Sequence, residues 1–382
     1  GFQQMLVMAF VKPEALSQIG TDEQAKATYR ALRTTDLRLP PALADKPVPA
    51  TFCATAVQAS GEVPPLVLLH GVDSSCLEFR RLLPELEHRG VEAYALDILG
   101  WGFADTSSVN SVGVVAKREA LRAFWQDELN GRKMALSGVS LGAAVIIDFF
   151  SAYPEAVASV ALIDPQGFID GAPPMPAPRA RGGIKVRGSR PLRSLANQLA
   201  YYNKEAYATD DAIRIGLLHT SRPGWEDDSV EWLLGGGYSV SGLVPKLASL
   251  PCLIMWGRQD EILPPSDFAT RFIEALPEAT FRWVEECGHS PHLEQPVVLA
   301  QALASFLPGD DIPGDSDCSQ LIAASQASPL DRLNALLDTP ILDTNERGGA
   351  LEPFKAFARS EPELAQVAAS IGALSFFVIL WR

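Results

Sequence analysis

The sequence predicts an α/β fold with a mostly parallel central sheet that is covered by helices on both faces. Short apolar runs recur along the chain, and segments with the spacing of amphipathic helices separate most of them. The length of 382 residues allows one large domain with extensions, and a hydrophobic content of 47% supports a sizeable core. Strands that alternate with helices form parallel sheets with both faces covered.

Six apolar segments are predicted strands, and four of the segments between them are predicted helices. Ligands of parallel sheets bind beyond the carboxyl ends of the strands, so candidate site residues are those that directly follow a strand. The predicted strands are 66–70, 92–96, 134–137, 159–163, 252–256 and 280–284, and the predicted helices are 78–89, 116–130, 141–152 and 266–275.

The segment 136–142 reads Leu-Ser-Gly-Val-Ser-Leu-Gly and contains a Gly-x-Ser-x-Gly pattern. Gly138 and Gly142 flank Ser140 where a strand is expected to pass into a helix, and small residues there permit a turn so sharp that the hydroxyl projects outward. The helix that follows directs its N-terminal amides toward any anion that forms at this point. The pattern predicts Ser140 as a nucleophile.

A serine hydroxyl is a weak nucleophile at neutral pH, and it needs a histidine base and a carboxylate that orients this base. Asp260 and His289 each follow a predicted strand, and the order serine, aspartate, histidine accompanies the Gly-x-Ser-x-Gly turn. Asp164 also follows a strand and is the alternative acid. The alternative for His289 is a histidine that is satisfied within the core.

Two backbone amides are candidates for an oxyanion hole. The first predicted strand ends at His70 and Gly71, and the glycine allows the chain to turn the amide of Val72 toward the site. The amide of Leu141, directly after the nucleophile, is the second donor. Loss of one such donor typically costs ~3 kcal/mol of transition-state stabilisation. A simple strand-ending turn is the alternative for the His-Gly pair.

From about residue 60 to residue 307 the chain resembles α/β-hydrolases, and more narrowly those of plant and algal plastids. The resemblance implies the fold, a triad of Ser140, His289 and Asp260, and a plastid location, but no substrate. It lies in His-Gly-Val-Asp-Ser-Ser-Cys-Leu-Glu-Phe-Arg-Arg (70–81), Ala-Leu-Asp-Ile-Leu-Gly-Trp-Gly-Phe-Ala-Asp (95–105), and shorter runs at 116–119, 140–145 and 224–228.

The strand–helix alternation breaks between the fourth and fifth predicted strands, where an insertion in this fold usually forms a cap over the pocket. Aromatic residues there, among them Trp225 and Trp232, either line an apolar substrate site or form the cap's own core. Trp101, which precedes the insertion, is a further candidate for the pocket. The expected organisation is an N-terminal extension at 1–58, a hydrolase core at 59–165 and 246–308, a cap at 166–245, a linker at 309–350 and a C-terminal membrane-associated segment at 351–382.

Six basic residues gather in the first part of the expected cap. Glycine and proline surround them, which favours a solvated surface loop over a surface for anionic lipid or an acidic partner. They are Arg179, Arg181, Lys185, Arg187, Arg190 and Arg193.

Charge and cysteine content exclude several classes of protein. A net charge of −14 argues against nucleic-acid binding. The five cysteines are odd in number and lack metal-ligand spacing, which indicates free thiols in a reducing compartment. The sequence contains no phosphate loop, dinucleotide fingerprint or metal motif, so neither a cofactor nor a metal is expected.

Residues 364–381 carry no charged side chain and precede Arg382. A helix of this length rises about 27 Å, against a hydrocarbon core of roughly 30 Å. Small residues in the run would let another helix approach closely. We therefore expect a membrane-inserted C-terminal helix, with a buried or amphipathic helix as the alternative.

Two functions follow from these features. The first is a membrane-tethered serine hydrolase that cleaves an ester of an apolar substrate, such as a lipid or a pigment ester, through an acyl-enzyme. The second is a hydrolase-like accessory subunit of a thylakoid membrane complex, such as a photosystem with its antennae, with little or no catalysis. Turnover that persists after Ser140→Ala would exclude the first, and co-migration with a large complex in mild detergent would favour the second.

Overall fold

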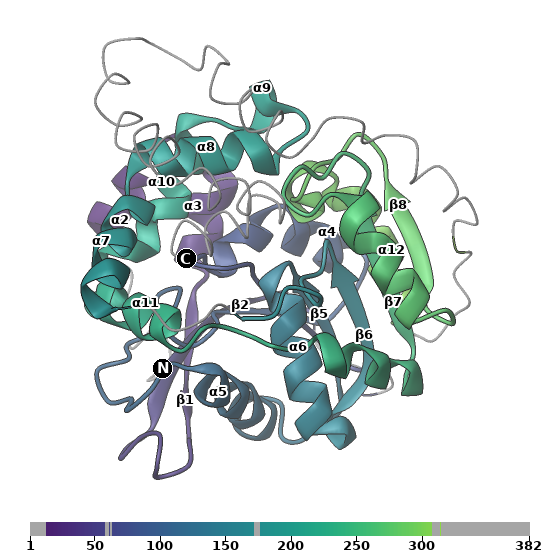
Figure 1. The fold of residues 1–382 in the computed structure, drawn as a ribbon, viewed down its shortest axis with the longest axis horizontal. Helices are drawn as coiled ribbons and strands as arrows, with labels where there is room; N and C mark the ends of the chain where they lie inside the picture. The colour runs from purple at the N-terminus through teal and green to yellow at the C-terminus, as the bar shows by residue number, and fades with distance from the viewer. Residues whose placement is uncertain (1–12, 58–60, 62, 172–175, 308–313, 315–382) are drawn as a thin grey trace.

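The computed structural model describes residues 13–57, 61, 63–171, 176–307 and 314. An eight-stranded sheet runs through this part of the chain in the order β1-β2-β4-β3-β5-β6-β7-β8 (Figure 1). The strands from β3 onward pair in parallel, which confirms the predicted mostly parallel sheet. These strands are β3 (Leu66–Leu69), β4 (Ala93–Leu96), β5 (Met134–Val139), β6 (Val157–Ile163), β7 (Cys252–Gly257) and β8 (Thr280–Val284).

Two further strands extend one edge of the sheet, β1 (Arg33–Leu37) and β2 (Val48–Ala54). They lie within residues that the sequence analysis placed in an N-terminal extension. β2 pairs antiparallel with both β1 and β4. Its Phe52 packs edge-to-face against Phe124, with 5.5 Å between ring centroids. This part of the expected extension therefore contributes to the hydrophobic core.

Helices cover both faces of the sheet, and alternate strand residues belong to different hydrophobic clusters. In β3, Val67 and Leu69 face one cluster, and Leu66 and Leu68 face the other. Strands buried on both faces read as continuous apolar runs, which explains why periodicity found them. The first cluster includes α5 (Val114–Asp127), α6 (Leu141–Ala152) and α12 (Pro265–Ala275), and the second includes α3 (Glu23–Arg30), α4 (Leu82–His88) and α14 (Pro296–Phe306).

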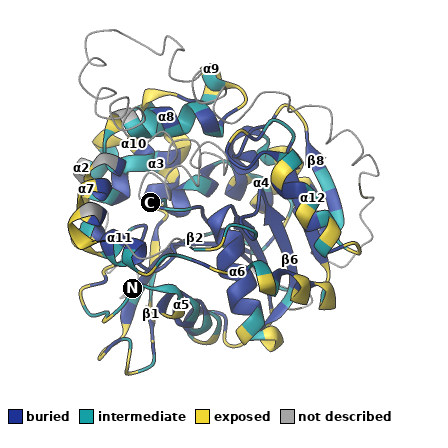
Figure 2. Cartoon of the chain, viewed as in Figure 1, coloured by how far each residue is buried: buried dark blue, intermediate teal, exposed yellow. Residues whose placement is uncertain are grey.

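The insertion between β6 and β7 is helical. The expectation of a loop at the basic residues is wrong, because all six lie in two helices, α7 (Ala177–Arg187) and α8 (Arg190–Ala200). Arg181, Lys185 and Arg190 are exposed, whereas Arg187 is buried. Figure 2 shows buried and exposed faces on the cap helices. The cap comprises α7 (Ala177–Arg187), α8 (Arg190–Ala200), α9 (Lys204–Tyr207), α10 (Asp210–Leu218), α11 (Trp225–Leu234) and the 3-10 segments η3 (His219–Ser221) and η4 (Ser241–Ser249).

Four short elements complete the fold, and two of them approach the site. η1 (Cys76–Arg80) follows the turn after β3, and α13 (Pro291–Glu294) follows the turn after β8. The other two are α2 (Pro13–Gln18) and η2 (Pro154–Ala156).

Within the part of the chain that the structure describes, the helices are all too short or too polar to cross a membrane. The helix expected at 364–381 lies outside the described residues, as does the linker at 309–350 apart from Gly314.

Candidate active site

Ser140 occupies a sharp turn between β5 and α6, with φ 52° and ψ −117°. A residue with a side chain adopts this backbone region only where the surrounding structure imposes it. A Cβ atom on Gly138 would lie 2.4 Å from the carbonyl carbon of Gly142, and one on Gly142 would lie 2.3 Å from the carbonyl oxygen of Leu69. Both glycines are therefore needed for the turn to close.

His289 and Asp260 meet at the carboxyl end of the sheet. His289 Nδ1 lies 2.7 Å from Asp260 Oδ2, and both side chains are buried. The other carboxylate oxygen of Asp260 accepts the backbone N–H groups of Ile262 at 2.8 Å and Leu263 at 2.9 Å. These bonds fix the carboxylate, which in turn holds the proton on Nδ1 and leaves Nε2 free to act as a base.

Ser140 and His289 line the same cavity, which has a volume of about 160 Å³. Ser140 Oγ and His289 Nε2 are both buried, and neither has a hydrogen-bond partner among the described residues. Catalytic hydrogen bonds in unliganded enzymes are often long and shorten only when substrate binds. Ser140 therefore borders the same cavity as the hydrogen-bonded pair of His289 and Asp260.

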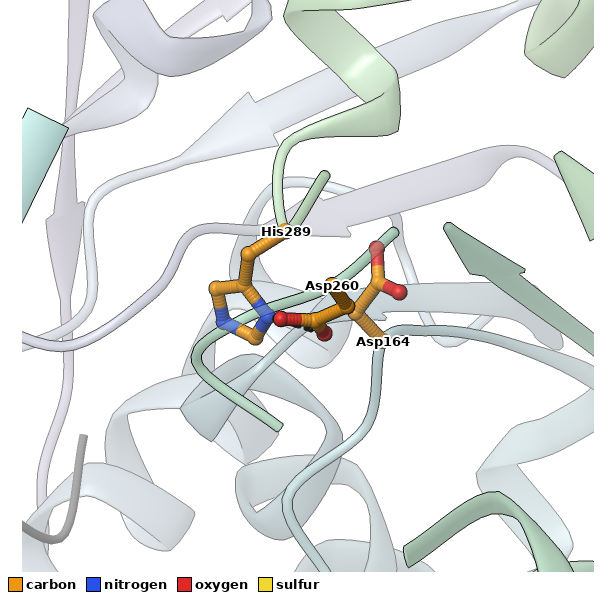
Figure 3. Close-up of side chains that lie close together, drawn as sticks. All are labelled: Asp164, Asp260 and His289. Atoms are coloured by element: carbon orange, nitrogen blue, oxygen red, sulfur yellow. Dashed lines mark hydrogen bonds and ion pairs between the residues drawn. The ribbon is translucent and has the colours of Figure 1, made fainter. Parts of the chain in front are cut away.

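Asp164, the alternative acid, lies beside the pair of Asp260 and His289 (Figure 3). Its Oδ1 accepts the backbone N–H of Gly257 at 2.7 Å, and its Oδ2 has no partner in the described part of the chain. Burial and the negative charge of Asp260 raise the pKa of Asp164 well above its ordinary value. The geometry therefore joins Asp260, and not Asp164, to the histidine.

Asp164, Asp260 and His289 offer ligand atoms that all lie within 4.8 Å of one another. A metal ion would require deprotonated ligand atoms directed at one point. Here the Nδ1 proton of His289 is directed at Asp260, and the raised pKa of Asp164 favours a neutral carboxyl group. The cluster suits a hydrogen-bonded acid–base pair better than it suits a cation.

His70 fixes the turn that carries the predicted oxyanion amide of Val72. The backbone N–H of Ile98 donates to His70 Nε2 at 3.0 Å, so Nδ1 carries the proton and donates to the carbonyl oxygen of Gly71 at 2.8 Å. Burial lowers the pKa of His70 to about 4, which keeps the ring neutral. The Gly71 carbonyl and the Val72 N–H belong to one trans peptide unit and point in opposite directions. The histidine therefore sets the direction of that amide.

Both candidate oxyanion amides lie close to Ser140. Gly71 and Val72 line the cavity. Leu141 is the first residue of α6 and follows Ser140 directly, so its N–H belongs to the free N-terminal turn of the helix.

Trp101, Trp225 and Trp232 are absent from the described residues that line the cavity. The rings of Trp101 and Trp232 pack edge-to-face with centroids 5.2 Å apart, and Lys117 Nζ lies 4.0 Å from the Trp101 centroid. Trp225 donates through Nε1 to Asp73 Oδ1 at 2.8 Å. These tryptophans form part of the packing between cap and core, and so they differ both from a pocket lining and from the cap's own core.

Sequence reasoning missed a polar contact between the cap and the turn after β3. Asp73 is 1% exposed, forms an ion pair with Arg187 Nε at 2.9 Å, and accepts hydrogen bonds from His219 Nε2 at 3.1 Å and from Arg193. Burial opposes ionisation, but the two guanidinium groups hold the pKa of Asp73 well below its usual range. Because Asp73 follows Val72 directly, the cap is attached next to a candidate oxyanion amide.

The sequence matches the alpha/beta hydrolase family over residues 66–302. The chain therefore belongs to the alpha/beta hydrolase family, which confirms the family that the sequence predicts. It is 37% identical over 248 residues to the alpha/beta hydrolase domain-containing protein VTE7 of Arabidopsis thaliana, with 64% of this chain and 74% of that protein covered.

Two more distant similarities cover a comparable share of this chain. The chain is 24% identical over 274 residues to the mouse (Mus musculus) monoacylglycerol lipase ABHD6, with 67% of this chain and 79% of that protein covered. The solved structure of a thermophilic esterase from Thermogutta terrifontis, with malate bound, has a TM-score of 0.58 and 20% identity. The match between the two structures covers 72% of this chain and 98% of the esterase. At this identity the solved structure supports the fold alone.

Proposed function

We propose that this protein is a serine hydrolase that cleaves carboxylic esters through an acyl-enzyme. The observation that carries the proposal is the 2.7 Å contact of His289 Nδ1 with Asp260, which leaves Nε2 unpaired in the cavity that also holds Ser140. Relatives in the family include a monoacylglycerol lipase, which is consistent with an ester substrate that has an apolar part.

In the proposed reaction, Ser140 Oγ attacks the ester carbonyl carbon while His289 Nε2 takes the hydroxyl proton. The amides of Val72 and Leu141 stabilise the negative oxygen of the tetrahedral intermediate. His289 then gives its proton to the departing alcohol oxygen, and the acyl group remains on Ser140. Water, deprotonated by the same nitrogen, attacks this acyl ester and releases the acid and the free serine.

The test is labelling with an alkyl fluorophosphonate, which reacts with an activated serine. We expect the wild-type protein to be labelled and Ser140→Ala to be unlabelled. Ser229→Ala is the matched control, because Ser229 is buried in α11 and its hydroxyl also has no partner among the described residues. Labelling that persists in Ser140→Ala contradicts the proposal.

We further propose that residues 364–381 attach the enzyme to a thylakoid membrane. The support is the uncharged run itself and the resemblance to plastid hydrolases. Chains with and without residues 351–382 are to be compared after alkaline carbonate extraction of plastid membranes. We expect the full chain to stay in the pellet and the shortened chain to be released, and release of both contradicts the proposal. Co-migration with a large pigment–protein complex, without probe labelling, would instead support an accessory subunit.

A further inference from the structure

The cavity that holds Ser140 and His289 also has a polar wall that the proposed mechanism does not use. Glu78 from η1 and His292 from α13 both line this cavity. They come from the segments that directly follow the predicted oxyanion turn and the base. Both residues therefore border the space that a substrate would enter.

His292 is buried without a polar partner. It is 2% exposed, and neither ring nitrogen has a hydrogen-bond partner in the residues that the structure describes. Burial lowers the pKa of His292 to about 4, so the ring is neutral near pH 7 and carries one donor and one acceptor nitrogen. Phe79 packs against this ring, with 5.5 Å between centroids. Unpaired buried polar atoms are costly, so this arrangement favours a ligand that pairs with them.

Glu78 lies beside His292 and also lines the cavity. Its Oε2 accepts the backbone N–H of Gly71 at 3.0 Å and lies 3.7 Å from His292 Nε2, which is too long for a hydrogen bond. The side chain is 25% exposed. A Cβ atom on Gly71 would lie 3.8 Å from each carboxylate oxygen and also 3.8 Å from Ser140 Cβ. Each carboxylate oxygen of Glu78 therefore lies at most about twice 3.8 Å from Ser140 Cβ.

We propose that Glu78 and His292 bind a free hydroxyl group of the substrate, so that the preferred substrate is an ester with a hydroxyl close to the scissile carbonyl. This inference rests on the proposed ester hydrolysis. One hydroxyl donates its hydrogen to Glu78 and accepts the N–H of His292, and so gives one of the two ring nitrogens a partner. A hydrocarbon group in the same place would leave that nitrogen unpaired. Asn197 Nδ2, buried at the same cavity and also without a described partner, is available to a further substrate oxygen.

The test compares matched esters on the full-length protein. One pair is p-nitrophenyl butyrate and p-nitrophenyl 3-hydroxybutyrate, which places the hydroxyl on the acyl side. The other is propyl butyrate and 2-hydroxypropyl butyrate, which places it on the alcohol side. We expect kcat/KM to favour the hydroxylated member of one pair by about 10- to 100-fold, as for a hydrogen bond to a charged group. The pair that shows the preference identifies the side.

Two variants assign that preference to the proposed residues. His292→Phe removes both ring nitrogens and keeps a flat ring. Glu78→Gln keeps an oxygen for the Gly71 N–H and replaces the free carboxylate oxygen with an amide donor. We expect either variant to bring the kcat/KM ratio of the pair close to 1. The controls His88→Phe and Glu274→Gln change exposed residues on α4 and α12, and they should keep the wild-type ratio.

The outcomes separate this inference from the proposed function. Ser140-dependent hydrolysis with a ratio near 1 for both pairs overturns the inference and leaves the proposed function intact. A preference that survives in both variants also overturns it. Fluorophosphonate labelling of each variant shows that its site has folded, and if His292→Phe is not labelled, Glu78→Gln gives the independent answer. If no ester is hydrolysed through Ser140, the proposed function and the inference fail together.

Discussion

Two aspartates lie beside His289, and their surroundings differ. Asp260 accepts two backbone N–H groups and faces the imidazole, whereas Asp164 accepts a single backbone N–H from Gly257. Burial and the neighbouring charge of Asp260 raise the pKa of Asp164. One negative charge shared between two close carboxyl groups is the expected result. The charged group is the one that can stabilise an imidazolium ion.

Exchange of each aspartate for asparagine separates these roles. Asp260→Asn should lower kcat by about 10⁴-fold, because the amide no longer selects the correct imidazole tautomer. Asp164→Asn replaces a neutral carboxyl group with a neutral amide, so kcat should fall by much less than the about 10²-fold loss that marks a proton-transfer group. The measurement is ester hydrolysis under saturating substrate. An equal loss in the two variants would contradict the assignment of the acid.

The raised pKa of Asp164 also predicts how stability depends on pH. The folded protein keeps this proton above pH 3.8, the ordinary pKa value, where an unfolded chain has released it. The folded state thus binds more protons, and the free energy of unfolding falls as pH rises from that value toward the raised pKa. In Asp164→Asn, the free energy of unfolding, measured with urea, should decrease less over this pH interval than in the wild-type protein. A steeper decrease in the variant would contradict the predicted direction of the pH dependence.

One of the contacts that attach the cap to the core is made by a buried carboxylate, Asp73. Donors from α7, α8, η3 and α11 converge on Asp73, and three of the four donor side chains are basic. Since Asp73 also follows Val72 in the chain, these contacts join the cap to the segment that carries the predicted oxyanion amide.

Removal of that charge should loosen the cap. Asp73→Asn leaves the buried Arg187 and the nearly buried Arg193 without a counter-charge, and breaking such a pair typically costs about 3–5 kcal/mol of unfolding free energy. Asp210→Asn is the control, because its pairs with Arg190 and Arg214 are exposed and typically contribute less than about 1 kcal/mol. Urea unfolding of both variants is the measurement. Equal stability of the two would refute the anchoring role of Asp73.

Across the whole molecule, how well the sequence predicted each element depended on how its residues are buried. The strands β3 to β8 are buried on both faces or nearly so, and their apolar runs located them. β1 reads Arg-Thr-Thr-Asp-Leu with one buried residue, so only its pairing with β2 defines it. The turn residues that position Ser140 follow from local glycine chemistry and were predictable. The contact of Arg187 with Asp73 joins distant segments and leaves no local pattern, so the cap's basic residues were interpreted as a loop.

The order of the chain has a consequence for the time at which the site can form. Ser140 is synthesised before the cap, and Asp260 and His289 come after it, in the turns that follow β7 and β8. A chain still emerging from the ribosome therefore contains the serine without its acid and base. On the proposed function, the growing polypeptide is inert toward esters until the turn after β8 has been added.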